Sequence, residues 1–410
     1  MNAVVDKKLF RQRIITSAMD TDAYKLHMMQ VVFEKYSSVI VKYRFKCRTD
    51  EDLTPYVSEI RDAINELEGL GFTDDQLMYL SKIPFLKEAF IDFLRQFRLD
   101  PKRYLTVSVE NGQLAIEAEG PWLYTIPFEI PVLAIVSEVR NRRRYADAGE
   151  DRIQGVLYDK VEHLKSELDR RGIESFKFAD FGTRRRFSYT VQNRVVDYLS
   201  KALPENFIGT SNYHLAREYG ITPIGTMAHE YLQAHQALTN VSQSQKEALE
   251  VWNQVYRGRL GVALTDCITT DAFLKDFDYL FAVLFSGVRH DSGDPIIWGE
   301  KFIKHYEELG IDPKTKTLVF SDGLNFDRAL DIAEHFQGRI QTSFGIGTFL
   351  TNDLGDYVSA NGETYKPLNI VMKMVECNGM PVAKISDEPG KSMCDDPVYL
   401  ANLKARFNVE

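Results

Sequence analysis

The feature that most constrains the fold is a regular alternation in the second part of the chain, after about residue 145. Short apolar runs typical of buried strands alternate there with amphipathic segments of helical period. Strands separated by helices pair in parallel, so the pattern predicts an α/β fold, an irregular (β/α)8-type barrel over residues 146–375. The eight runs are FKFADFG, NFIGTSN, TPIGTMAHE, GVALTDC, GVRHDSGD, TLVFSDG, RIQTSFGIGT and NIVMKMVE.

The first part of the chain has a different pattern and is expected to form an N-terminal α+β domain, residues 1–145. Apolar and basic residues alternate from Val39 to Arg48, which predicts a half-buried strand. Asn111-Gly112 lies between two alternating runs and suits the positive φ angles of a type I′ hairpin, so this domain should carry antiparallel sheet. A helix is expected from Phe128 to Tyr145. The tail, residues 376–410, is expected to fold back onto this domain.

Composition excludes several classes of partner. The net charge of −9 gives the molecule no general attraction for nucleic acid or anionic lipid. The 4 cysteines form no C-x-x-C pair, which is typical of a reducing compartment. The opening MNAVVDKKLFRQRIITSAMD has no apolar core for a signal peptide, and no segment approaches the roughly 18 uncharged apolar residues of a membrane span. We therefore expect a cytoplasmic protein whose partners are small molecules, with no nucleic acid and no membrane.

Acidic side chains follow the predicted strands directly, at the ends where a barrel gathers its catalytic loops. Asp180, Asp266 and Asp322 each come immediately after an apolar run. The segment GVRHDSGDP is the most site-like, because it brings a guanidinium and groups able to hold magnesium or ribose hydroxyls together at one strand end. Its residues are Arg289, His290, Asp291, Ser292 and Asp294, of which Asp294 is expected to cap the next helix.

Two further segments suit anions. The loop SFGIGT offers Gly345, Gly347 and Thr348 to a phosphate, although alone it is no more specific than a turn, and the chain has neither a dinucleotide fingerprint nor a P-loop. The segment FADFGTRRRFS puts three arginines, residues 184–186, at the expected start of a helix. Cations there oppose the helix dipole unless an anion binds nearby, and all three cannot point to water.

The sequence around His229 allows more than one interpretation of this residue. HEYLQAH is similar to a zinc-binding helix, but Gln233 stands where the second histidine would be needed, so zinc is not expected. A single histidine near a helix start is more often a capping or packing residue than a catalytic one. The residue pattern alone leaves this choice open.

The motifs together closely resemble the bacterial nicotinate phosphoribosyltransferases, over nearly the whole chain. The segments that carry the resemblance, in order, are DTDAYKLHM, FADFGTRRRFS, FIGTSN, GTMAHE, ALTDC, GVRHDSGDP, VFSDG and SFGIGT. The family is similar in fold to the type II phosphoribosyltransferases. The resemblance implies ATP-dependent joining of nicotinate to 5-phosphoribosyl pyrophosphate in NAD salvage, with Mg²⁺ as cofactor and a possible homodimer.

The same resemblance implies roles for individual residues. His229 matches the histidine that ATP phosphorylates, with Asp266 and Asp291 as catalytic acids and magnesium ligands. The nicotinate pocket maps onto two rings, two cations and two hydroxyls, and the phosphoribosyl site onto an acid and the glycine loop. These residues are Tyr24, Phe181, Arg184, Arg289, Thr226 and Ser211 for nicotinate, and Asp322, Gly345, Gly347 and Thr348 for the phosphoribosyl group.

Alternatives remain from inside and outside this class. A nicotinamide phosphoribosyltransferase is the nearest, and Ser211 is the one residue that argues against it, because nicotinamide-using relatives have an aspartate there. A sugar-phosphate barrel lyase or isomerase would need a lysine or glutamate base on the rim, and no convincing one is visible in the sequence. The segment ALTDCITTD lacks the paired acids of a type I phosphoribosyltransferase, and RNRRRY alone does not make a nucleic-acid site.

Overall fold

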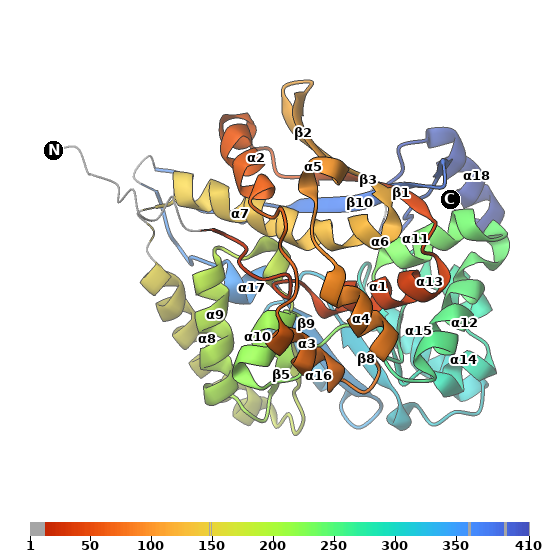
Figure 1. The fold of residues 1–410 in the computed structure, drawn as a ribbon. Helices are drawn as coiled ribbons and strands as arrows, with labels where there is room; N and C mark the ends of the chain where they lie inside the picture. Colours follow the sequence, from red (N-terminus) through yellow and green to blue (C-terminus); the bar gives the residue numbers. More distant parts are fainter. Residues whose placement is uncertain (1–12, 147, 149, 360–361, 389–391, 410) are drawn as a thin grey trace.

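The computed structural model describes residues 13–146, 148, 150–359, 362–388 and 392–409. Two sheets organise the fold, an antiparallel sheet of five strands in the order β11-β10-β1-β3-β2 and a parallel sheet of six in the order β5-β4-β9-β8-β7-β6. Figure 1 shows the antiparallel strands at the top of the molecule and the parallel strands below them. The predicted α/β fold with a separate antiparallel sheet is confirmed. The first twelve residues, which include much of the stretch examined for a signal peptide, lie outside the described residues.

The antiparallel sheet is built around β1 (Ile40–Cys47), which pairs with β3 (Gln113–Pro121) on one side and β10 (Ile370–Cys377) on the other. β2 (Leu105–Glu110) and the short β11 (Met380–Pro381) complete it. The predicted hairpin is confirmed, since Asn111 and Gly112 have φ angles of 51° and 73° between the paired strands β2 and β3.

The helices of the first domain pack beneath and beside this sheet. α7 buries nearly its whole length, as its apolar sequence predicts. Among the described residues, Trp122–Arg144 is long and apolar enough to cross a membrane, but 89% of its apolar window is buried inside the fold, as in a core helix. The helices are α1 (Ala23–Lys35), α2 (Val57–Asn65), α3 (Asp74–Ser81), α4 (Glu88–Gln96), α5 (Pro101–Tyr104), α6 (Trp122–Thr125) and α7 (Glu129–Arg144), with 3-10 turns η2 (Thr54–Tyr56) and η3 (Ile126–Phe128).

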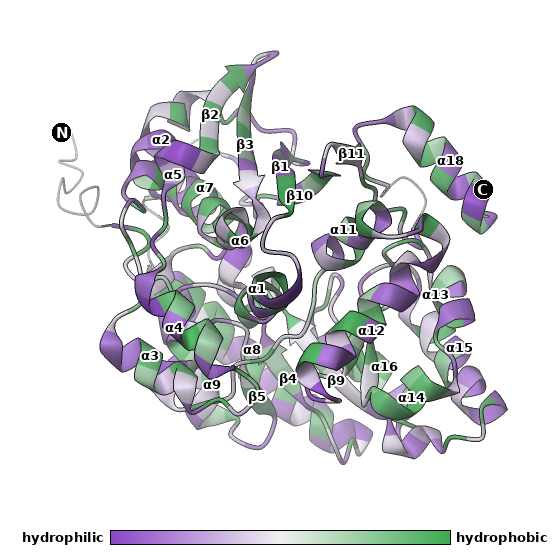
Figure 2. Cartoon of the chain, turned by 45° about the vertical axis from the view of Figure 1, so that its right-hand side comes forward, coloured by the Kyte–Doolittle hydropathy of each residue, from purple (hydrophilic) through white to green (hydrophobic). Residues whose placement is uncertain are grey.

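The strands of the parallel sheet alternate along the sequence with helices, and these helices cover the outer side of the sheet. α15 and α16 bury the apolar faces expected from their sequences, including Phe302 and Phe336, and Asp294 caps α15 as predicted. Figure 2 shows hydrophobic and hydrophilic residues side by side on outer helices such as α9 and α12, as their packing on a barrel requires. The strands are β4 (Phe178–Asp180), β5 (Phe207–Thr210), β6 (Val262–Leu264), β7 (Gly287–His290), β8 (Thr317–Phe320) and β9 (Gln341–Ile346).

The helices of the second part and the tail run from α8 to α18. They are α8 (Glu150–Arg171), α9 (Tyr189–Ala202), α10 (Tyr213–Tyr219), α11 (His229–Leu238), α12 (Ser244–Tyr256), α13 (Thr270–Asp276), α14 (Tyr279–Leu284), α15 (Pro295–Glu308), α16 (Phe326–Phe336), α17 (Thr348–Thr351) and α18 (Pro397–Phe407). The 3-10 turns are η4 (Thr183–Arg185), η5 (Val241–Gln243) and η6 (Pro313–Thr315).

Two of the eight predicted barrel strands need correction. NIVMKMVE is β10 and pairs with β1 in the antiparallel sheet, so it is not a barrel strand. A buried apolar run shows that a strand forms but not which sheet it joins, and here β1 offers a partner along nearly its whole length. The TPIGT segment forms only a parallel bridge from Pro223 to Thr210, because proline has no N–H to donate to a ladder.

The TPIGT segment nevertheless lies between the two edges of the parallel sheet. Ile224 N donates to Thr210 O of β5 over 2.8 Å, and Thr226 Oγ1 donates to Val262 O of β6 over 2.7 Å. Segment 222–226 therefore joins the edge strands, and sheet and segment together form an irregular ring.

Candidate active site

The main candidate site is a cavity of about 650 Å³ at the carboxyl ends of the parallel strands. Both parts of the chain line it, because the antiparallel sheet and α7 face the barrel rim across it. The predicted site residues Tyr24, Phe181, Arg184, Ser211, His229, Arg289, Asp291, Asp322, Gly345, Gly347 and Thr348 all lie on its wall. One chain thus supplies both sides of the cavity.

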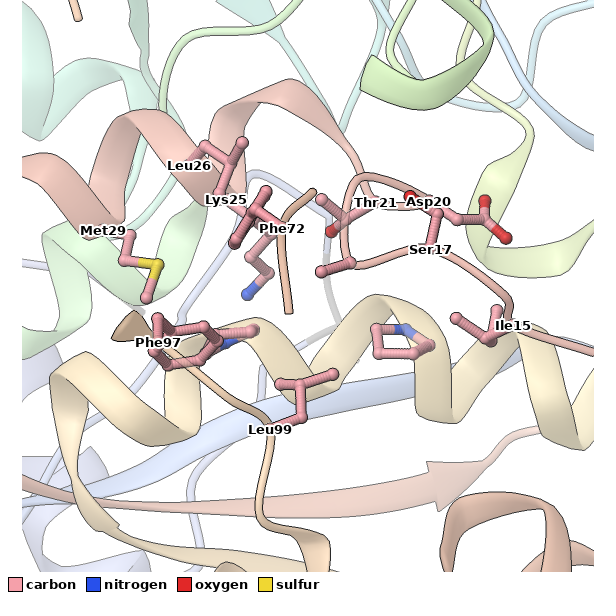
Figure 3. A pocket seen from close by; sticks show the side chains of 13 residues that line it. Ile15, Ser17, Asp20, Thr21, Lys25, Leu26, Met29, Phe72, Phe97 and Leu99 are labelled. Carbon is pink, nitrogen blue, oxygen red and sulfur yellow. The ribbon is translucent and has the colours of Figure 1, made fainter. Parts of the chain in front are cut away.

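Two other cavities are less suited to chemistry. The one beneath α1, shown in Figure 3, has a volume of about 20 Å³, which is room for about one water molecule. The other, about 640 Å³, enters the barrel from the amino-terminal ends of the strands and meets the main cavity at Phe181, Ile224 and Gly345. It contains none of the histidine and acid side chains described next.

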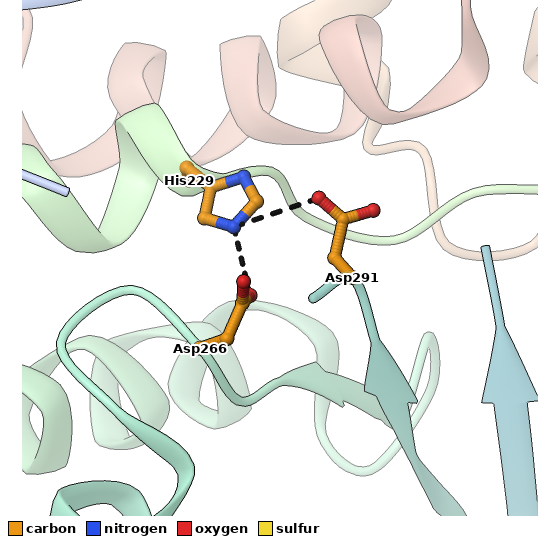
Figure 4. Close-up of side chains that lie close together, drawn as sticks. All are labelled: His229, Asp266 and Asp291. Atoms are coloured by element: carbon orange, nitrogen blue, oxygen red, sulfur yellow. Dashed lines mark hydrogen bonds and ion pairs between the residues drawn. The ribbon is translucent and has the colours of Figure 1, made fainter. Parts of the chain in front are cut away.

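His229 is the first residue of α11 and is buried beside two of the predicted acids (Figure 4). Its Nε2 atom lies 2.8 Å from Asp266 Oδ1 and 3.7 Å from Asp291 Oδ2. Burial, followed by the nearby charge of Lys384, lowers the pKa of His229 to about 4. The ring is therefore neutral at pH 7, and with Nε2–H donated to Asp266 the lone pair is on Nδ1. A neutral imidazole with a free Nδ1 lone pair is a nucleophile.

Lys384 completes this cluster and was not found from the sequence. Its Nζ atom lies 2.9 Å from Asp266 Oδ2 and 3.8 Å from Asp291 Oδ2. Burial alone would raise the pKa of Asp266, but Lys384 and His229 hold that pKa well below its usual value. The residue comes from the tail, whose backbone pairs with the barrel loop after β6 through Ile385 N and Cys267 O. No spacing in the sequence links position 384 to position 266.

The two acids of the cluster, Asp266 and Asp291, differ in how well they could bind Mg²⁺. Asp266 is buried, and both of its oxygens are engaged, by His229, by Lys384 and by the Ser292 hydroxyl at 2.6 Å. Asp291 is more open, with a side chain 29% exposed to the cavity. Carboxylate oxygens that face a water-filled space are the ligands Mg²⁺ prefers. The donor set therefore fits Mg²⁺ at Asp291, whereas Asp266 is placed to orient the imidazole.

Two aromatic side chains face the same cavity from different domains. Tyr24 lies on α1 and Phe181 directly after β4, and the buried Tyr24 hydroxyl has no hydrogen-bond partner in the described part of the chain. Gly345 permits the position of Phe181, because a Cβ at residue 345 would lie 2.4 Å from that ring. Gly345 therefore makes room for the ring of Phe181, in addition to any contact that it makes with phosphate.

The predicted carboxylate-binding cations both reach the cavity. Arg184 has a side chain 37% exposed, and its Nη1 atom is 3.8 Å from Glu129 Oε1. The Nε atom of Arg289 is buried without a hydrogen-bond partner among the described residues. Asp22, which was not among the predicted site residues, accepts a hydrogen bond of 2.6 Å from the Ser211 hydroxyl. A carboxylate therefore lies beside Ser211, the residue expected to favour nicotinate over nicotinamide.

Two sequence expectations about this region change. Thr226 is not among the described residues that line the cavity, since its hydroxyl is bonded to β6. The three arginines do not begin a helix: Arg184 and Arg185 are in η4, and α9 begins only at Tyr189. Arg186 points away from the cavity and is buried against Asp20 in a two-point ion pair.

Further cations face the cavity from the antiparallel sheet and η4. Arg48, Arg185 and Lys373 line it, as Gly347 and Thr348 of the glycine loop also do. Burial lowers the pKa of Lys373 to about 8, and burial with the charges of Arg184 and Arg48 lowers that of Arg185 to about 10. Burial and mutual repulsion make such a group of cations unfavourable unless an anion binds. A group of this kind is typical of a site for a highly charged anion.

An irregular α/β barrel with a buried histidine between two acids and a cation-rich cavity at the strand ends is an enzyme fold suited to phosphate-bearing substrates. The model of the nicotinate phosphoribosyltransferase (NAPRTase) family matches residues 176–410, and that of the NAPRTase N-terminal domain matches residues 19–137. The chain belongs to the nicotinate phosphoribosyltransferase family of enzymes, which confirms the resemblance seen in the motifs.

Individual relatives agree with this assignment. The chain is 54% identical to a nicotinate phosphoribosyltransferase of Vibrio parahaemolyticus, over 97% of this chain and 93% of the relative. It is 52% identical to that of Ectopseudomonas mendocina, over 99% of this chain and 100% of the relative. The crystal structure of the Vibrio cholerae nicotinate phosphoribosyltransferase superposes with a TM-score of 0.96 at 49% identity, covering 99% of this chain and 96% of that one.

Proposed function

We propose that this enzyme joins nicotinate to the phosphoribosyl group of 5-phosphoribosyl pyrophosphate and uses ATP to drive the reaction. The overall change is nicotinate, 5-phosphoribosyl pyrophosphate, ATP and water to nicotinate mononucleotide, pyrophosphate, ADP and phosphate, a step of NAD salvage. The observation that carries the proposal is the hydrogen bond of 2.8 Å between His229 Nε2 and Asp266, which leaves the Nδ1 lone pair available. Burial, which lowers the pKa of His229, favours the neutral ring. The γ-phosphoryl group of ATP is the electrophile for that lone pair.

The proposed binding mode follows the cavity wall. Tyr24 and Phe181, which line the cavity, would stack on the pyridine ring, and Arg184 and Arg289 would pair with its carboxylate. Asp322, Gly347 and Thr348 would hold the phosphoribosyl group, and Arg48, Arg185 and Lys373 its anionic oxygens. Magnesium at Asp291 would neutralise charge on the departing pyrophosphate.

The alternative functions have less support than this proposal. Family membership argues against a sugar-phosphate lyase or isomerase, even though Lys373 and Lys384 do reach the cavity. Nicotinamide as substrate is disfavoured because Arg184 and Arg289 both face the cavity, and only one of these two guanidinium groups would be needed to balance Asp22. We also propose a cytoplasmic location, which the four free cysteines support.

The test is a product assay with nicotinate or nicotinamide, 5-phosphoribosyl pyrophosphate, and Mg-ATP present or absent. We expect mononucleotide from nicotinate that increases with ATP, together with a phosphate on His229 detected by mass spectrometry. His229→Ala should lose both the phosphate and the ATP effect. His335→Ala, an exposed histidine paired with Glu300, is the matched control and should retain both. No product from nicotinate under any condition would contradict the proposal.

A further inference from the structure

A row of alternating charges runs from the cavity into the protein interior. Arg184 Nη1 is 3.8 Å from Glu129 Oε1, and Glu129 Oε2 is 2.6 Å from Lys25 Nζ. Lys25 also forms an ion pair with Glu230 Oε1. The side chains of Lys25, Glu129 and Glu230 are only 1%, 7% and 5% exposed, so water screens these charges poorly.

Each charge in the row is held by a different element, so the row cannot rearrange freely. Lys25 lies on α1, Glu129 begins α7, and Glu230 is in the first turn of α11. Figure 3 shows the Lys25 side chain extending from α1 toward the interior. Glu230 also accepts a hydrogen bond from the Tyr43 hydroxyl.

The balance of charge behind Arg184 depends on Lys25. Arg184 and Lys25 together carry two positive charges, and Glu129 and Glu230 together carry two negative ones, so the row is neutral. Asp22, at the cavity wall nearby, adds a further carboxylate. Without Lys25, Arg184 would face an excess of buried negative charge, and a substrate carboxylate would be repelled more strongly than a neutral amide.

We propose that Lys25 is a positioning residue that sets the preference of this site for a carboxylate over a carboxamide. Lys25 does not line the cavity, so it acts through the buried charges behind Arg184. With Lys25 in place, two cations balance Glu129 and Glu230, whereas without it Arg184 alone would face both carboxylates. This inference rests on the proposed function, in which Arg184 pairs with the nicotinate carboxylate.

The measurement is the ratio of kcat/KM for nicotinate to that for nicotinamide, because any shared loss of catalysis cancels in it. Lys25→Met should lower the ratio on the order of 10-fold, as one buried charge close to the substrate is removed. Glu230→Gln should raise it, since it removes a negative charge. The double variant Lys25→Met/Glu230→Gln is neutral again and should return the ratio close to that of the wild type.

The control is Glu51→Gln, which removes a carboxylate from another buried ion pair, with Arg140, at side-chain exposures of 7% and 2%. It should leave the ratio unchanged. Equal losses for both substrates in Lys25→Met, or a double variant as impaired as the single one, would overturn the inference. If Lys25→Met does not fold, an unchanged ratio in Glu230→Gln would overturn it. Failure of the proposed function is distinct, because the wild type itself would then make no nicotinate product.

Discussion

The Nε2 atom of His229 donates to Oδ1 of Asp266 over 2.8 Å, while the other oxygen of Asp266 is held by Ser292 and Lys384. The carboxylate therefore cannot turn away from the ring. It keeps the proton on Nε2 and the lone pair on Nδ1, in the way that a buried acid selects the tautomer of a catalytic histidine.

Asp266→Asn tests this arrangement. The amide can donate to Nε2, which moves the proton to Nδ1 and removes the nucleophilic lone pair. We expect the rate of His229 phosphorylation to fall on the order of 10⁴-fold, as with a histidine held in the wrong tautomer in a catalytic triad. Transfer of label from γ-labelled ATP measures it. Asp271→Asn, an exposed acid on α13, should change nothing, and labelling of Asp266→Asn at the wild-type rate would disprove the tautomer assignment.

Lys373 should make substrate binding sensitive to alkaline pH. Its pKa is lowered from 10.5 to about 8, so the folded enzyme loses this cation as the pH rises through 8. The KM for 5-phosphoribosyl pyrophosphate should then increase by about 10-fold, the loss of one charge-assisted contact. Lys373→Arg keeps its charge over this range and should move the increase to higher pH. Identical pH profiles for the two proteins would exclude Lys373 from the phosphate site.

Gly345→Ala should displace the ring of Phe181. A Cβ at residue 345 would lie 2.4 Å from that ring, well inside van der Waals contact. We expect the KM for nicotinate to rise about 10-fold because the stacking surface moves. Gly155→Ala is the control, since nothing lies within 4 Å of its Cβ in α8. A nicotinate KM unchanged in Gly345→Ala would mean that Phe181 does not contact the pyridine ring.

The Arg186 and Asp20 pair should matter for stability. Both Asp20 oxygens bind the guanidinium, at 2.7 and 2.8 Å, and the side chains are 0% and 2% exposed. Asp20→Ala leaves a buried charge without its partner and should cost about 3–5 kcal/mol. The similar pair of Arg339 and Glu300 is 43% and 40% exposed, so Glu300→Ala should cost below about 1 kcal/mol. Urea unfolding compares the two, and equal losses would contradict this ranking.

Much of the fold was predictable because local patterns report local structure. The Asn111-Gly112 hairpin, the cap at Asp294 and the apolar faces of α15 and α16 follow from residues close in sequence. Eleven of the residues predicted from the motifs, from Tyr24 to Thr348, lie on the cavity wall. The local structure and the site motifs were predictable for the same reason. Turns, helix caps and the residues that follow a strand depend on neighbours in the sequence, so a local pattern reveals them.

The sequence by itself determined the two kinds of sheet, the family and the residues at the barrel rim. Only the tertiary structure decided which sheet β10 joins, and that Lys384 and Lys373 reach the site while Thr226 does not. It also decided that Lys25 lies between Glu129 and Glu230. The physical reason is that these ion pairs and strand pairings join residues far apart in the chain, and their charges interact only once folding has brought them together and excluded water.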